Sequence, residues 1–292
     1  MPAEDQIVVS REWEQITRAP LRGLVMFVGA SDTGKSTLAH WLFEQLLQQS
    51  FAPVAFLDGD PGQSALGPPS TVTLTIARGT THFPGRGRRW RRFVGSTTPR
   101  HHMLPLLTGV ARLVEVARSR RIATIVYDTT GLIDPGVGAV ELKLAKIDLL
   151  RPETLIAIRC TQELEPLLAP LRKSARTRIV ELDPSPALRP RNMLTRRRYR
   201  VRRFAEHFAG ASLRGFSLRD FAVFPDAPPG PNQLLAFEDA NGFTLALGIV
   251  TKTDATAGTA TILTPIRDLS AVDAIRLADL TVDPVRFRDQ RR

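Results

Sequence analysis

The chain has 292 residues, of which 43% are hydrophobic and 24% are charged, so it is long enough to bury a sizeable core. This balance excludes a disordered, collagen-like or coiled-coil chain. The longest strongly apolar run, residues 24–28, is far shorter than the roughly 20 residues of a transmembrane helix. The acidic N-terminal residues and the single cysteine argue against secretion and disulfides, so we expect a cytoplasmic protein without membrane association.

The net charge points to an anionic partner. Forty Lys and Arg residues against 29 Asp and Glu give a formal charge of +11, and most of the positive charge comes from arginine. Arginine clusters at residues 85–92 and 189–203, and its planar guanidinium suits phosphate recognition. Nucleic acid is therefore one expected partner, and a solvated basic surface is the alternative. The sequence indicates no particular protein partner.

The pattern along the chain predicts an α/β fold. A buried strand at residues 24–28, a helix beginning at Lys35 and a second strand at 53–57 form a βαβ unit, which implies a parallel sheet. The alternation continues with helices at 102–118 and 137–146 and strands at 122–127, 154–158 and 178–182. Short alternating segments follow at 221–224, 233–237, 243–250 and 259–264.

We therefore expect a P-loop NTPase core, with a parallel sheet flanked by helices, and a small C-terminal β-rich domain. The predicted boundaries are residues 1–20 for an N-terminal segment, 21–215 for the P-loop domain and 216–292 for the β-rich domain.

The residues from Gly29 to Ser36 match the phosphate-binding pattern G-x-x-x-x-G-K-[ST] between a predicted strand and a predicted helix. The glycines let backbone N–H groups surround a phosphate, Lys35 reaches the β- and γ-phosphates, and the Ser36 hydroxyl binds Mg²⁺. The predicted nucleotide-binding residues are Gly29, Ser31, Asp32, Thr33, Gly34, Lys35, Ser36 and Thr37. An ordinary glycine turn before a helix is the alternative.

Carboxylates follow two other predicted strands. Asp58 and Asp60 end the second strand, and Asp128 ends the strand at 122–127. Ligands of open α/β sheets bind at the carboxyl ends of the strands, so these groups should face the phosphate site. One could orient Mg²⁺ and another could accept a proton from an attacking hydroxyl. The predicted metal-binding residues are Ser36, Asp60 and Asp128, and the alternative for residues 58–64 is a solvated turn.

Two short patterns favour a GTPase instead. Residues 128–131 read D-x-x-G, and residues 251–254 read T-K-T-D, a guanine-reading pattern. The second lies in the predicted β-rich region and is followed by a strand rather than a helix, so we give the GTPase hypothesis less weight.

Taken together, four patches resemble the polynucleotide 5′-hydroxyl kinases, which include the kinase subunit of the pre-mRNA cleavage complex and nucleolar pre-rRNA processing kinases. The patches are GASDTGKST at 29–37, DGDPGQS at 58–64, FVGSTTP at 93–99 and YDTTGL at 127–132. A fifth match is an arginine-rich lid at about 189–209, in which Arg191 and Arg196 precede a basic helix. On that helix Val201, Phe204, Ala205 and Phe208 share an apolar face, while Arg196, Arg200 and Arg203 share another.

The resemblance implies Mg²⁺-dependent transfer of the γ-phosphate of ATP to the 5′-hydroxyl end of RNA, and possibly of DNA, in RNA processing. Lys35, Arg191 and Arg196 would stabilise the migrating phosphoryl group, and Asp60 would deprotonate the acceptor, with Asp58 as the alternative base. The substrate-binding residues implied are Asp58, Gln63, Thr97, Thr98, Pro99 and Arg200.

Some relatives carry a tryptophan after the T-x-G patch, where this chain has Leu132, so Trp90 in the basic cluster at Arg86–Arg92 is a candidate stacking residue instead. The alternative functions are a GTPase or regulatory P-loop NTPase, and a nucleotide-bound nucleic-acid adaptor without kinase activity.

Overall fold

The computed structural model describes residues 9, 11–17, 20–49, 52–79, 87–185, 188 and 191–292. The chain divides into two compact units. The first unit contains residues 1–59, 74–89 and 111–191, and the second contains residues 60–73, 90–110 and 192–292. The chain therefore passes from one unit to the other directly after Gly59 and directly after Arg191.

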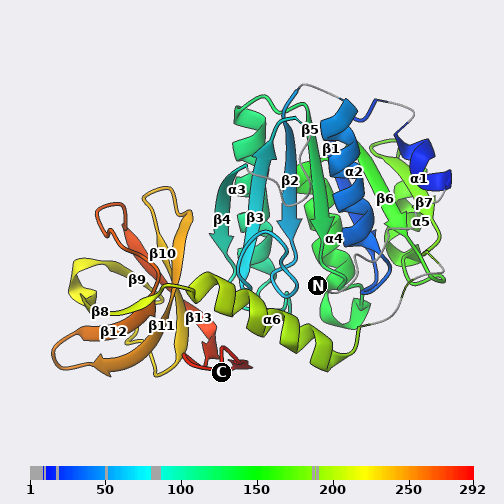
Figure 1. The fold of residues 1–292 in the computed structure, drawn as a ribbon. Helices are drawn as coiled ribbons and strands as arrows, with labels where there is room; N and C mark the ends of the chain where they lie inside the picture. Colours follow the sequence, from blue (N-terminus) through cyan, green and yellow to red (C-terminus); the bar gives the residue numbers. More distant parts are fainter. Residues whose placement is uncertain are drawn as a thin grey trace. The chain divides into compact units, whose positions relative to one another are not determined.

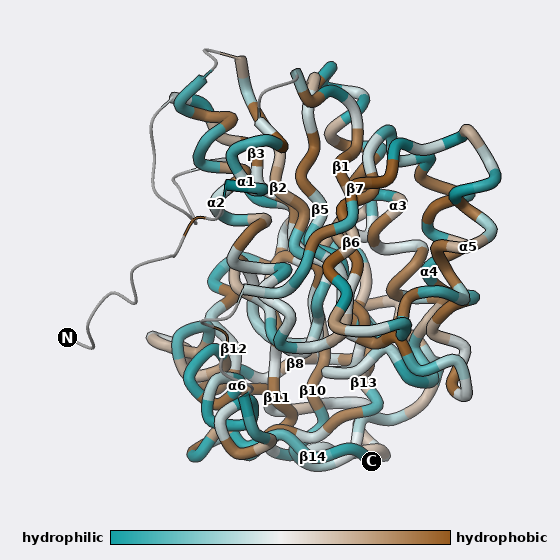
Figure 2. Tube along the Cα trace, turned by 90° about the vertical axis from the view of Figure 1, so that its right-hand side faces the viewer, coloured by the Kyte–Doolittle hydropathy of each residue, from teal (hydrophilic) through white to brown (hydrophobic). Residues whose placement is uncertain are grey.

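The first unit is organised on a sheet whose strand order is β4-β3-β2-β5-β1-β6-β7. Its central strands are β1 (Gly23–Gly29), β2 (Val54–Gly59), β5 (Thr124–Thr129), β6 (Thr154–Ile158) and β7 (Arg178–Leu182). These five strands pair in parallel. Most of their residues are buried, as expected for strands covered on both faces, and Figure 2 shows the hydrophobic colour along β1 and β6.

Helices cover both faces of this sheet. Helix α2 (Lys35–Gln49) crosses β1, β2 and β5 on one face, and Figure 1 shows α4 (Ala139–Leu150) on the opposite face. Helix α5 (Glu165–Lys173) packs against α4, and the short α1 (Arg11–Ile16) places Trp13 5.5 Å from the ring of Trp41. Strands β3 (Thr71–Ala77) and β4 (Arg88–Phe93) and helix α3 (Met103–Ser119) have residues in both units.

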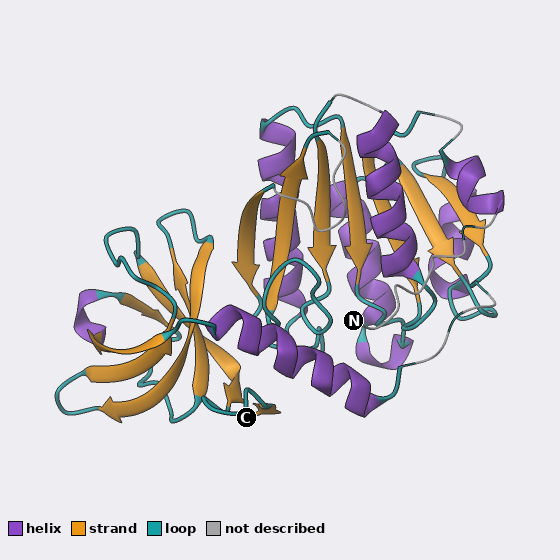
Figure 3. Cartoon of the chain, viewed as in Figure 1, coloured by secondary structure: helices purple, strands orange, loops and turns teal. Residues whose placement is uncertain are grey.

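The second unit is built on a mainly antiparallel sheet (Figure 3) with the order β14-β13-β10-β11-β12-β8, and β9 pairs with β13 in parallel. Its strands are β8 (Ser212–Ser217), β9 (Ala222–Phe224), β10 (Gln233–Glu238), β11 (Thr244–Asp254), β12 (Thr259–Thr264), β13 (Ala274–Val282) and β14 (Asp289–Arg291).

Side chains along each strand of this sheet point alternately to its two faces, and apolar side chains occupy both faces. On β10, Leu234 and Ala236 belong to one hydrophobic cluster and Leu235 and Phe237 belong to the other. The first cluster also contains Phe204 and Phe208 of helix α6 (Met193–Phe208). The predicted apolar face of the basic helix is therefore confirmed at these two positions, and it covers one face of the C-terminal sheet.

The expected class of fold is confirmed, with a parallel-rich sheet and a second β-rich sheet. The grouping of the chain differs from the expected boundary at 215, because α6 and β8 belong to the second unit. The reason is that α6 packs into the C-terminal core and β8 pairs with β12. In the part of the chain that the structure describes, no helix combines the length and apolarity needed to cross a membrane.

Candidate functional site

The predicted phosphate-binding loop lies between β1 and α2, at the carboxyl edge of the parallel sheet. Gly29 and Gly34 have φ values of +155° and +86°, a region that L side chains rarely adopt. A Cβ atom on Gly29 would lie only 2.5 Å from the Ile158 carbonyl oxygen, so this position has no room for a side chain. Lys35 is buried, and its Nζ donates hydrogen bonds to the Ala30 carbonyl and to Thr33 Oγ1.

The remaining loop residues surround this lysine. Ser31 and Thr37 are exposed, Asp32 and Ser36 are partly exposed, and Asp32 has a φ of +60°. The T-x-G patch closely approaches the loop, because a Cβ on Gly131 would lie 2.5 Å from Ser31 Oγ. A bend that contains left-handed residues and is followed by a helix N-terminus is a cradle for phosphate. The residues present therefore fit a nucleotide phosphate.

Two carboxylates lie next to each other at this edge of the sheet. Asp58 at the end of β2 is the register partner of Asp128 at the end of β5, and Phe27 of β1 pairs with Asp128 on the other side. Both aspartates are buried, with 2% and 4% of their surface exposed. Carboxylate oxygens and a Ser36 hydroxyl are hard ligands of the kind that Mg²⁺ prefers, so this donor set fits the cation directly or through water.

An arginine from the lid segment, residues 189–209, contacts the phosphate-binding loop. The Arg191 backbone N–H donates to Asp32 Oδ2 at 3.2 Å, and Arg191 Nε lies 3.5 Å from Asp32 Oδ1. The two residues are 159 positions apart in the chain. Residues 189 and 190 at the start of the predicted lid lie outside the described residues.

Buried lysines of α4 also approach this edge. Lys143 Nζ donates to the Thr130 carbonyl at 3.0 Å and lies 3.4 Å from Thr129 Oγ1. Lys146 Nζ stands 5.5 Å from the centroid of the Tyr127 ring. The sequence analysis assigned neither lysine a role, although two of the chain's few lysines stand one helical turn apart on α4, a signal that could have identified them.

The predicted acceptor residues belong to the second unit, where they form a connected group. Asp60 Oδ1 accepts hydrogen bonds from the backbone N–H groups of Gly62 at 2.8 Å and Gln63 at 3.1 Å. A Cβ on Gly62 would lie 2.5 Å from the Thr97 carbonyl oxygen, so the DGDPGQS loop packs closely against the GSTTP loop. Thr97 and Thr98 are partly exposed, and Pro99 is buried.

Helix α6 is attached to this group by its polar face. Gln63 Nε2 lies 3.5 Å from the Arg196 carbonyl oxygen, and Tyr199 Oη donates to the Ser64 carbonyl at 3.0 Å. Arg203 donates to the carbonyl oxygens of Ser64, Ala65 and Gly67 at 2.9–3.2 Å. The helical wheel placed Arg196, Arg200 and Arg203 on one face that could present them to a ligand. This expectation is corrected for Arg203, because its guanidinium donates to backbone carbonyls instead.

Arg200 is held by a carboxylate that the sequence analysis did not identify. Its Nε lies 3.0 Å from both carboxylate oxygens of Asp289, and Thr97 Oγ1 lies 3.5 Å from Asp289 Oδ2. Asp289 is buried, so the pair fixes the Arg200 guanidinium beside the GSTTP loop. No local sequence signal marks Asp289, because it lies 89 residues from Arg200.

The expectation for Trp90 is wrong. Trp90 is only 9% exposed, whereas Arg88 and Arg89 of the same strand, β4, are exposed. A buried indole offers no open face for stacking a base. Arg86, at the start of the predicted basic cluster, lies outside the described residues.

The second GTPase pattern lies inside a β-hairpin. Residues 251–254 end β11, and Lys252 and Asp254 pair in register with Thr261 and Thr259 of β12. Asp254 Oδ1 accepts the backbone N–H of Ala257 at 2.9 Å, so this carboxylate stabilises the turn. The geometry supports the lower weight given to the GTPase hypothesis.

Comparisons with known proteins agree with the resemblance. The family model described as mRNA cleavage and polyadenylation factor CLP1 P-loop matches residues 29–210. A polyribonucleotide 5′-hydroxyl-kinase of Pyrococcus abyssi is 27% identical, with 96% of this chain and 92% of the relative covered. One of Thermococcus kodakarensis is 29% identical, with 88% of each chain covered. A chain of a wild-type Clp1p-Pcf11p complex has a TM-score of 0.70 at 14% identity, covering 92% of this chain and 77% of that one.

Proposed function

Since the chain belongs to the family described as mRNA cleavage and polyadenylation factor CLP1 P-loop, we propose that it transfers the γ-phosphate of ATP to the 5′-hydroxyl end of a polyribonucleotide. Relatives named polyribonucleotide 5′-hydroxyl-kinases, aligned over most of their length, support this activity. The observation that carries the proposal is the contact between Arg191 and Asp32, because it holds a second cationic side chain beside the loop that contains Lys35.

The residues of the first unit would bind the phosphates. Lys35 and the loop N–H groups neutralise the β- and γ-phosphate oxygens, and Ser36 with Asp128 would hold Mg²⁺. The cation, when bound, supplies further positive charge to the β- and γ-phosphate oxygens. The closeness of Ser31 to Gly131 supports this assignment, because it places the T-x-G patch directly beside the phosphate-binding loop.

The residues of the second unit would bind and activate the acceptor. The 5′-hydroxyl oxygen forms a bond to the γ-phosphorus, the bond from that phosphorus to the β,γ-bridging oxygen breaks, and ADP leaves. The hydroxyl proton passes to Asp60, whose Oδ1 is oriented by two backbone N–H groups. Asp58 is the alternative base, although its burial favours a role beside the cation. Gln63 and residues 97–99 would contact the terminal nucleotide.

The lid arginines would stabilise the transferring group. Negative charge spreads over the equatorial oxygens in the transition state, and a cationic side chain at that position contributes about 10³-fold or more in kcat. We assign this role to Arg191 and Arg196. Arg191→Ala should therefore lower kcat by about 10³-fold, while the KM for ATP changes far less.

The decisive experiment measures transfer of label from γ-labelled ATP to a 5′-hydroxyl RNA oligonucleotide and to the DNA of the same sequence. Labelled RNA should appear with the wild type, and Lys35→Ala and Asp60→Asn should abolish the product. Lys252→Ala is the matched control, because this lysine belongs to the T-K-T-D pattern in the β-hairpin. The control should retain full activity.

Two outcomes would contradict the proposal. Release of phosphate from GTP without an acceptor, lost in Lys252→Ala, would establish a GTPase. Binding of ATP and RNA without transfer of label to either oligonucleotide would establish a nucleic-acid adaptor.

A further inference from the structure

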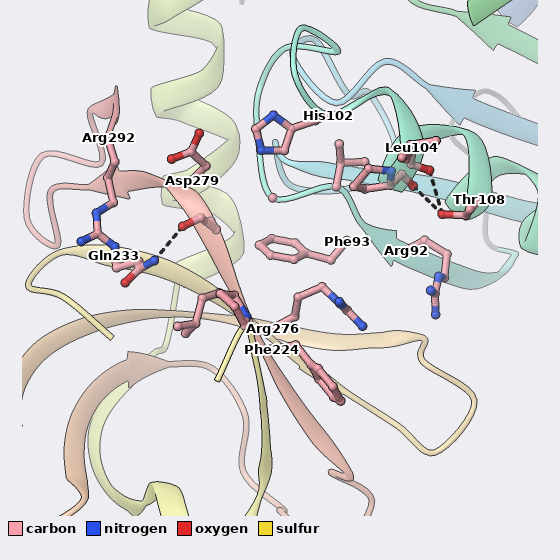
Figure 4. Close-up of a pocket in the computed structure, with 16 residues that line it drawn as sticks. Arg92, Phe93, His102, Leu104, Thr108, Phe224, Gln233, Arg276, Asp279 and Arg292 are labelled. Atoms are coloured by element: carbon pink, nitrogen blue, oxygen red, sulfur yellow. Dashed lines mark hydrogen bonds between the residues drawn. The ribbon is translucent and has the colours of Figure 1, made fainter. Parts of the chain in front are cut away.

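A pocket of about 610 Å³ in the second unit lies outside the residues assigned so far. Residues at the end of β4, the start of α3, the β9 end and strand β13 form its walls. Figure 4 shows Arg276 and Phe224 on one side of the pocket and His102, Leu104 and Thr108 on the other, with Arg92 below Thr108. The lining is thus a mixture of cationic, aromatic and aliphatic side chains.

Positive charge predominates in this pocket. Arg92, Arg276 and Arg292 line it, against one acidic side chain, Asp279. Asp279 itself lies 4.0 Å from Arg291, which offsets its charge. The pocket therefore favours an anionic ligand.

The arginines are oriented by fixed neighbours. Arg276 Nε donates to Glu238 Oε2 at 3.1 Å, yet 41% of the Arg276 side chain stays exposed. Arg92 Nη1 donates to the carbonyl oxygens of Gly242 and Asn241. These contacts hold the guanidinium groups of Arg92 and Arg276 in place, so that less side-chain entropy is lost when a ligand binds.

An aromatic surface stands beside these charges. The Arg276 guanidinium lies 5.2 Å from the centroid of the Phe224 ring, and Phe224 is 46% exposed, which is unusual for so large an apolar side chain. A ring stacked with a guanidinium is a surface on which nucleobases of any sequence stack.

The pocket is directly connected to the proposed acceptor loop. Val94 and Gly95, which line it, precede Thr97 in the chain, and His102, which also lines it, follows Pro99. The Asp279 backbone N–H donates to the Gly95 carbonyl at 3.0 Å, which fastens this end of the loop to β13. The two residue steps from Gly95 to Thr97 span at most about 7 Å of extended chain. This length is comparable with that of two stacked nucleotides, at about 3.4 Å each.

We propose that this pocket binds the second and third nucleotides of the polynucleotide strand whose 5′ end is phosphorylated. The base of the third nucleotide stacks on Phe224 and Arg276, and the phosphodiesters on either side of it lie against Arg92 and Arg292, which line opposite ends of the pocket in Figure 4. The inference rests on the proposed kinase function. It adds a subsite that lets the enzyme bind longer acceptors more tightly than short ones. An acidic protein segment has the negative charge that the arginines attract, but it has no base to stack on Phe224. We therefore favour the nucleic acid.

The test compares single-stranded 5′-hydroxyl RNA of two and of ten nucleotides as acceptors. Phe224→Ala removes the exposed ring, and Arg292→Glu reverses a charge without touching the Arg276–Glu238 pair. Arg267→Glu is the matched control, because it reverses the charge of an exposed arginine of the same unit outside the pocket. Thermal melting of each variant shows that folding is unchanged.

For the wild type, the KM of the decanucleotide should be well below that of the dinucleotide. Phe224→Ala should raise the decanucleotide KM about fivefold or more, the loss typical of one stacked base, and leave kcat and the dinucleotide KM unchanged. Arg292→Glu should reduce the slope of log affinity against log salt by about 0.7, the value for one phosphate contact on a single strand. The control should change neither quantity.

Equal effects of Phe224→Ala on both acceptors, or none on either, would overturn the subsite while leaving the kinase proposal intact. Loss of binding to a poly-glutamate peptide in Arg292→Glu, with an unchanged decanucleotide KM, would assign the pocket to an acidic protein segment. If no acceptor is phosphorylated, the kinase proposal fails. Fluorescence anisotropy of the labelled decanucleotide without ATP then tests the pocket by itself, and equal affinities of the wild type and both variants would overturn it.

Discussion

Acidification should destabilise the protein through His207, a partly buried residue of α6. Its Nε2 accepts the backbone N–H of Leu247 at 3.1 Å, which requires the neutral imidazole. The ring also packs edge-on against Phe208, with the centroids 5.0 Å apart. Burial, together with the smaller effect of the positive charges of Arg91 and Arg203, lowers the pKa of His207 from 6.5 to about 3.

The sign and size of the effect follow from proton linkage. Between pH 6.5 and about 3 the unfolded chain binds a proton at His207 and the folded chain does not, so the free energy of unfolding falls as the pH falls. This contribution is complete above pH 6.5 and is lost at about 1.4 kcal/mol per pH unit below it. Lowering the pH from 7 to 5 should therefore remove about 2 kcal/mol through this residue.

Urea denaturation at pH 7, 6 and 5 measures this loss. His207→Gln keeps an oxygen that can accept the Leu247 N–H but does not titrate, so its free energy of unfolding should depend less steeply on pH, by about 1.4 kcal/mol per unit. His40 of the first unit, whose pKa burial lowers to about 4, contributes a loss of the same sign, and His40→Gln measures that contribution separately. An identical pH slope in His207→Gln and the wild type would refute the reasoning.

Three further substitutions test packing and charge, each by its effect on the urea midpoint and the thermal melting temperature. Gly59→Ala would place a Cβ 2.4 Å from Tyr127 Cε2 and should cost about 1–3 kcal/mol; an unchanged melting temperature would contradict this. Arg200→Ala leaves the buried Asp289 carboxylate without its guanidinium and should lower the free energy of unfolding by about 2 kcal/mol, whereas Arg200→Lys should lower it less. Lys146→Met removes the buried ammonium over the Tyr127 ring and should cost about 2 kcal/mol; a melting temperature equal to that of the wild type would exclude a stabilising role.

Much of the fold was predictable because its signals are local. Apolar runs bounded by turn residues identify Thr154–Ile158, Arg178–Leu182 and Thr259–Thr264 to the residue. The phosphate-binding loop was predictable because glycine at a left-handed position leaves a fixed pattern in the sequence. Strand β13 was not predicted, although it pairs with three strands of the second unit, β9, β10 and β14.

The candidate site was less predictable because the role of a charged side chain depends on partners that are distant in the sequence. The wheel of the basic helix correctly predicts that Phe204 is buried, but it does not distinguish Arg203, which donates to backbone carbonyls, from Arg196. Likewise, the arginines around Trp90 suggest a stacking surface, whereas the indole is buried. Burial along β4 does not alternate, so the contacts of this strand with the rest of the fold decide which of its side chains are exposed.

The anchoring of α6 limits how the lid segment can move. From Tyr199 onward the helix is fixed by side-chain bonds to the DGDPGQS loop and by Phe204 and Phe208 in the C-terminal core. Its first turn is held by the Asn192 side chain, which accepts the Thr195 N–H at 2.8 Å, and by Gln63 Nε2, which lies 3.5 Å from the Arg196 carbonyl oxygen. A swing of the whole helix would break all these contacts at once, whereas unwinding of one turn breaks few. We therefore expect any opening of this segment to begin at its N-terminal end, as a local motion that is separate from global unfolding.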